Sequence, residues 1–170
     1  GPTRYGHQKE GCEAAALADF GRDRITVLRP GVVLGPREYV GRLPWWLLRI
    51  AAGGTVVAPG DPERRIQPVD VRDVASFAVT VAERRLGGRF IIKKKMEGNT
   101  FGGLIAECAA VTGSSAQIVW APDGVLAAAG VRQWSELPLW RTAAGVWRVD
   151  PGQAQHAGLR CRDLADTVAD

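Results

Sequence analysis

Two residues capable of proton chemistry stand one helical turn apart near the start of the chain. Tyr5 precedes Lys9 by four positions, and a helix places positions i and i+4 on the same face. The ammonium of Lys9 can therefore lie beside the phenol of Tyr5, where a cation favours the ionised phenolate. Such a tyrosine can donate or accept a proton near neutral pH. The same spacing also occurs by chance in many helices, so the pair needs support from the rest of the chain.

The segments that must position this pair alternate between helices and strands. An alanine-rich helix continues over residues 12–20 and ends at Gly21, and a short β-branched run follows at 24–28. Further helices are expected over 43–52, 70–85, 101–112, 123–129 and 162–168, and further strands over 55–58, 89–92 and 117–120. Strands separated by helices predict an α/β fold with a largely parallel sheet.

Two motifs downstream give the pair a context. Residues 29–36 read Arg-Pro-Gly-Val-Val-Leu-Gly-Pro, and residues 69–75 read Val-Asp-Val-Arg-Asp-Val-Ala. A Tyr-x-x-x-Lys helix followed by an Arg-Pro-x-x-x-x-Gly-Pro turn and a Val-Asp-Asp-Val-Ala-like box resembles the extended short-chain dehydrogenases/reductases, the NAD-dependent epimerase/dehydratase family. The resemblance covers nearly the whole chain. It implies the C-terminal part of a Rossmann-like doubly wound sheet together with the smaller substrate-binding region.

One feature of that family is missing from this sequence. The family holds the pyrophosphate of its dinucleotide on a glycine-rich turn at a helix N-terminus, and no such strand-turn-helix motif occurs here. We therefore expect a C-terminal part of a longer enzyme, inactive as an isolated chain. By the resemblance, residues 1–36 and about 64–92 complete the dinucleotide-binding sheet, whereas about 37–63 and 93–170 form the substrate-binding region.

The resemblance also implies roles for particular residues. Tyr5 would be the general acid/base at the substrate hydroxyl or carbonyl, and Lys9 would hold the nicotinamide ribose of NAD or NADP while favouring the phenolate. The turn that would pack beside the nicotinamide comprises four consecutive residues, Pro30, Gly31, Val32 and Val33. A strand end that needs a sharp turn is the alternative interpretation of these four.

Candidate substrate-binding residues follow the turn. Arg42, Trp45 and Trp46 lie where the family's variable substrate region begins, and an aromatic wall with one cation suits a mostly hydrophobic substrate that carries an anionic group. Core packing is the alternative for both tryptophans. Asp70 and Asp73 could be paired catalytic carboxylates, but a helix N-cap and a first-turn acid explain them better.

Composition excludes several other classes of function. The net charge of +4 comes from basic residues scattered among acids, and the single run, Lys93-Lys94-Lys95, has no aromatic interleaving, so we expect no nucleic-acid partner. No apolar run approaches the ~20 residues that span a bilayer, and no secretory signal is present, so we expect no membrane partner and a cytoplasmic location. Three widely spaced cysteines without a histidine cluster indicate neither a disulfide framework nor a metal site.

The function expected from the sequence is that of an NAD(P)-dependent oxidoreductase or epimerase/dehydratase acting on a small hydroxyl or carbonyl substrate. A non-catalytic dinucleotide-sensing or protein-interaction protein on the same scaffold is the alternative, and the intact Tyr5/Lys9 pair favours catalysis. The expected partner is a small-molecule substrate. An exposed edge of an incomplete sheet also allows pairing with a second copy, which would give a homo-oligomer.

Overall fold

The strands of this chain pair in parallel, two by two. The computed structural model describes residues 3–94, 98–143 and 145–170, so Lys95 of the lysine run lies outside the described residues. The three pairs are β1 (Thr26–Pro30) with β5 (Gly88–Ile92), β2 (Val32–Leu34) with β4 (Pro68–Asp70), and β3 (Thr55–Pro59) with β6 (Gln117–Ala121). Because parallel strands need crossover connections, helices fill the segments between them. The α/β fold class predicted from the alternation is thereby confirmed.

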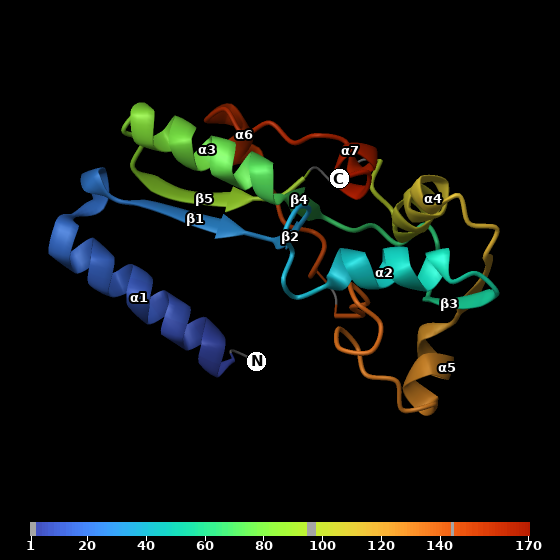
Figure 1. Cartoon of the computed structure of the whole chain (residues 1–170). Coiled ribbons are helices and arrows are strands. Elements are labelled where there is room, and N and C mark those ends of the chain that lie inside the picture. Colours follow the sequence, from blue (N-terminus) through green and yellow to red (C-terminus); the bar gives the residue numbers. More distant parts are fainter. Residues whose placement is uncertain (1–2, 95–97, 144) are drawn as a thin grey trace.

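The helices divide between two ends of the molecule (Figure 1). At one end, α1 (Arg4–Phe20) and α3 (Val71–Glu83) lie on opposite sides of the β1–β5 pair, with α6 (Gly152–His156) beside α3. The other end holds four helices: α2 (Arg42–Ala51), α4 (Phe101–Thr112), α5 (Asp123–Ala128) and α7 (Leu164–Val168). None of the described helices is both long enough and apolar enough to cross a membrane.

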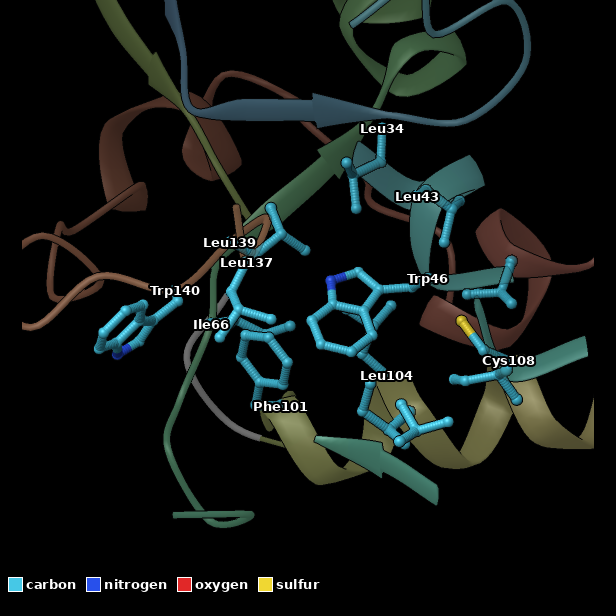
Figure 2. Packing of buried hydrophobic residues seen from close by; sticks show 14 of the residues in the cluster. Leu34, Leu43, Trp46, Ile66, Phe101, Leu104, Cys108, Leu137, Leu139 and Trp140 are labelled. Carbon is cyan, nitrogen blue, oxygen red and sulfur yellow. The ribbon is translucent and has the colours of Figure 1, made fainter. Parts of the chain in front are cut away.

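Each end has its own hydrophobic core. In the smaller core, α3 and α6 pack on β5, and the rings of Phe77 and Phe90 meet edge to face at 5.5 Å. The larger core surrounds Trp46 and Phe101, whose rings also meet edge to face, at 5.4 Å (Figure 2). Cys108 is fully buried there, as its place on an apolar helix face predicts, and burial raises the pKa of its thiol to about 12.

Local capping signals fix several helix ends. Thr100 Oγ1 accepts a hydrogen bond from the Gly103 amide at 3.0 Å, and Gly113 ends α4 with φ of 64°. Asp70 accepts from the Arg72 amide at 2.8 Å and caps α3. Asp73, in the first turn of α3, accepts from the Arg162 side chain at 2.8 Å. Asp70 is thus the N-cap of α3 and Asp73 an acid in its first turn, as the sequence predicts.

Some elements differ from the sequence-based expectation. The first strand begins at Thr26 rather than residue 24, because Arg22–Arg24 forms a 3-10 turn after α1. The three-residue strands β2 and β4 and the short helix α6 were not expected. Segments this short contain too few residues to show a hydrophobic period.

Candidate functional site

A pocket of about 600 Å³ lies between the start of α1, the β1–β2 turn and the loop that follows β2. We call it the Tyr5 pocket. It is lined by Tyr5, residues 30–40, Arg42, Val71 and Trp134. The pocket therefore brings together the predicted proton donor, the predicted nicotinamide turn and the predicted substrate cation. These residues come from segments that are far apart in the sequence.

The predicted Tyr5/Lys9 pair is in contact. Thr3 caps α1 by accepting a hydrogen bond from the Gly6 amide at 3.1 Å, which starts the helix one residue before Tyr5. The Lys9 ammonium lies 5.5 Å from the centroid of the Tyr5 ring, within cation–π range. The ammonium thus sits over the ring. Tyr5 is 68% exposed, so its hydroxyl can reach a ligand.

An ion pair ties α1 to the strands. None of the residues of α1 is buried, so apolar packing contributes little to its position. Glu13 accepts two hydrogen bonds from the Arg29 guanidinium, at 2.8 and 2.5 Å, and Arg89 approaches the same carboxylate at 3.4 Å. The bonds from Arg29 hold the pKa of Glu13 below its usual range. Since Arg29 belongs to β1, this contact sets the position of Tyr5 relative to the turn.

The β1–β2 turn packs closely against the end of β5. The Gly31 amide donates to the Ile92 carbonyl at 2.9 Å. A Cβ atom added at Gly31 would lie 2.7 Å from Lys93 Cε, so glycine leaves room for this lysine. Lys93 Nζ donates to the Val146 carbonyl at 3.2 Å, and burial lowers the pKa of Lys93. The close packing of Lys93 against the backbone of Gly31 is therefore a structural reason for glycine at this position, independent of any contact with a ligand.

Arg42 and Trp134 are neighbours in the lining of the Tyr5 pocket. The Arg42 guanidinium lies 4.8 Å from the centroid of the Trp134 ring. Glu38 accepts from the Arg42 amide at 2.9 Å, which holds the start of α2. Arg42 Nε is buried and has no hydrogen-bond partner within the described ranges. Trp134 was not predicted as a site residue, because nothing near it in the sequence indicates that it meets Arg42.

The two tryptophans expected in the substrate wall do not line this pocket. Trp46 is fully buried and donates its indole N–H to the Pro138 carbonyl at 3.0 Å, so it belongs to the larger core (Figure 2). Trp45 is partly buried and meets Trp46 edge to face at 4.6 Å. Core packing, the alternative interpretation, describes their positions. The aromatic side chains that do line the pocket are Tyr5, Tyr39 and Trp134.

Comparison with known proteins shows a fold and no close relative. No protein-family profile and no curated protein sequence matches the chain. Among solved structures it is similar to RMD of Pseudomonas aeruginosa complexed with NADPH, with 17% identity and a TM-score of 0.69 over 97% of this chain and 52% of that one. It is also similar to two UDP-glucose 4-epimerases. That of Thermus thermophilus, in complex with NAD, has 20% identity and a TM-score of 0.65 over 99% of this chain and 52% of that one. The enzyme of Thermotoga maritima, with UDP-glucose, has 24% identity and a TM-score of 0.65 over 97% of this chain and 50% of that one.

This chain shares its fold with about half of each of these solved structures. It spans about half the length of the solved structures that it matches. The fold predicted from the order of motifs is confirmed by this likeness. In the structure, Tyr5 at the start of α1 and the Pro-Gly turn line one pocket, whereas Lys9 is not among its lining residues.

Proposed function

We propose that the chain is the nicotinamide-facing and substrate-facing half of an NAD(P)-dependent oxidoreductase or epimerase/dehydratase. Its substrate is a small molecule with a hydroxyl or carbonyl group. The observation that supports this most directly is the Tyr5 pocket, where the Tyr-x-x-x-Lys helix meets the Pro-Gly turn. Solved structures of the same fold include complexes with NAD and NADPH.

The residues of the pocket fit the nicotinamide end of a dinucleotide. Tyr5 offers an exposed phenol that passes a proton to or from the substrate oxygen. Lys9 lies one turn along and does not line the pocket, but its ammonium is at the Tyr5 ring, where it would hold the ribose hydroxyls. The cofactor, when bound, supplies hydride exchange at its nicotinamide ring. Arg42 and Trp134 also line the pocket, and we infer that they contact the substrate.

The described residues provide no glycine-rich turn for the pyrophosphate of the dinucleotide. In the part of the chain that the structure describes, no strand is followed by a glycine-rich turn and a helix start of the kind that binds pyrophosphate. We therefore expect the 170-residue chain to bind NAD(H) or NADP(H) weakly, through the nicotinamide ribose, and to be inactive alone.

Saturation-transfer difference NMR of the chain with NADH tests this proposal. The nicotinamide and adjacent ribose protons should receive more saturation than the adenine protons. Lys9→Met should weaken this binding about fivefold, the loss of about one hydrogen bond, and Tyr5→Phe should weaken it in the same direction. Phe20→Leu is the control and should leave the affinity unchanged, because Phe20 stands on the same helix, is 57% exposed and does not line the pocket.

Two results would contradict the proposal. One is stronger saturation of the adenine protons than of the nicotinamide protons. The other is an affinity that neither Lys9→Met nor Tyr5→Phe changes. Calorimetry that shows micromolar binding of NADH by the isolated chain would contradict the narrower expectation of weak binding.

A further inference from the structure

A basic pocket lies at the start of β1 and β5, whereas the Tyr5 pocket lies at the end of β1 (Figure 1). It consists of two adjoining cavities of about 530 and 460 Å³, which share Asp23, Arg85 and Gly87 in their linings. We call the two cavities together the Arg85 pocket. Their charged lining residues are one acid and four arginines: Asp23, Arg22, Arg24, Arg85 and Arg89.

The positive charge of this pocket is largely uncompensated. Among the residues that the structure describes, three of the four arginines take part in no ion pair: Arg22, Arg24 and Arg85. The fourth, Arg89, approaches Glu13 at 3.4 Å. The four come from the 3-10 turn after α1, the turn before β5, and β5 itself. A cleft lined by charges of one sign attracts ligands of the opposite sign, so the pocket suits an anion.

Arg85 occupies a backbone position that favours glycine. It follows α3 with φ of 52°, and the Leu86 amide donates to the Val81 carbonyl at 2.9 Å, a hydrogen bond typical of helix ends that use glycine. A left-handed backbone is unfavourable for a residue with a side chain. The helix dipole favours a cation at this end, but Arg84, one residue earlier, already supplies one. Local structure therefore does not explain the arginine, whereas its place in the lining of both cavities does.

The turn before β5 is built to bring the arginines together. A Cβ atom added at Gly87 would lie 2.9 Å from the Arg22 carbonyl oxygen, so glycine lets this turn approach the 3-10 turn. Arg22 and Arg85 therefore line the same cavity. Gln153, from α6, lines that cavity as well, and its side-chain amide can donate a further hydrogen bond.

We propose that the Arg85 pocket binds a small ligand with two or more oxyanion groups, such as a diphosphate or a polycarboxylate. Arg22 and Arg89 bind one group in the larger cavity, Arg24 binds another in the smaller cavity, and Arg85, which lines both, contacts both groups. Guanidinium groups hold phosphate and carboxylate through paired, charge-assisted hydrogen bonds. The site goes beyond the proposed function, because none of its residues lines the Tyr5 pocket.

NMR titration of the ¹⁵N-labelled 170-residue chain with pyrophosphate, and separately with citrate, tests the site at constant ionic strength. The amide resonances of Gly87 and Gly88 should shift and saturate, which assigns the binding to this pocket because both glycines line it. Saturation by pyrophosphate alone identifies a phosphate-bearing ligand, and saturation by citrate alone identifies a carboxylate-bearing one. Saturation by both shows that the oxyanion groups themselves are recognised.

Arg85→Gly should weaken this binding about tenfold. The variant should fold normally, because glycine readily adopts the left-handed backbone of this position. Arg22→Gln should weaken binding by a similar factor. Arg148→Gln is the matched control and should leave the affinity unchanged, since Arg148 is exposed and lines neither cavity. The proposal is overturned if neither anion gives saturable shifts of the two glycine amides. It is also overturned if Arg85→Gly binds as tightly as Arg148→Gln.

Discussion

Replacing Glu13 with glutamine should release α1 from the strands. The carboxylate accepts two hydrogen bonds from Arg29 and is also approached by Arg89. The Glu13 side chain is 16% exposed and that of Arg29 is 47% exposed, so solvent screens the pair. We expect a loss of about 1 kcal/mol, the upper end for exposed pairs. Because no residue of α1 is buried, this is a large part of what holds the helix in place.

Hydrogen exchange measures this release directly. A loss of about 1 kcal/mol changes an opening equilibrium about fivefold, so amides of α1 should exchange about five times faster in Glu13→Gln. Amides of α3 and β5 should be unchanged, because the smaller core does not include α1. Asp19→Asn is the control on the same helix, since Asp19 is exposed. Unchanged exchange in α1, or equal acceleration in β5, would refute the assignment of Glu13 as the tether.

Three further predictions concern stability. Acid should have the same effect as Glu13→Gln. The pKa of Glu13 in the folded protein lies below its ordinary value of 4.5, so the stabilisation by its ion pair is complete above about pH 4.5 and is lost as the pH falls through the lowered pKa. Hydrogen exchange of the α1 amides, measured as a function of pH, will show this loss. Gln67→Leu should cost about 3 kcal/mol in urea unfolding. The fully buried Gln67 side chain donates a hydrogen bond to the Val149 carbonyl and accepts one from the Val149 amide, both at 3.0 Å. Gln117→Leu is the control and should cost far less, because Gln117 is exposed. Thr100→Ala should cost about 1 kcal/mol by removing the cap of α4, and an unchanged urea midpoint would contradict it.

Local signals in the sequence predicted much of the fold. The helix expected over 101–112 has the same bounds in the structure, where Thr100 caps its start and Gly113 ends it. The order of the Tyr-x-x-x-Lys helix and the Pro-Gly turn predicted a common site, and the Tyr5 pocket contains Tyr5 and the turn. These signals work because capping and turn geometry depend on residues within a few positions of each other.

Long-range contacts account for what the sequence did not predict. Trp45 and Trp46 are adjacent and chemically identical, yet only Trp46 is fully buried, because the face of α2 that meets α4 is decided by tertiary packing. Trp134 reaches Arg42 across a segment with no periodic pattern. The tether between Glu13 and Arg29 likewise joins a helix to a strand through a pairing that spacing alone does not specify.

Trp134, in the lining of the Tyr5 pocket, contacts two arginines. Its ring lies between two guanidinium groups, that of Arg42 at 4.8 Å and that of Arg141 at 4.7 Å. Its backbone has φ of 75°, a left-handed conformation that costs a residue with a side chain about 1–3 kcal/mol. Two cation–π contacts of about 0.5–1 kcal/mol each are of comparable size and help to offset this cost. Arg141 does not itself line the Tyr5 pocket, so it acts on this pocket only through the ring of Trp134.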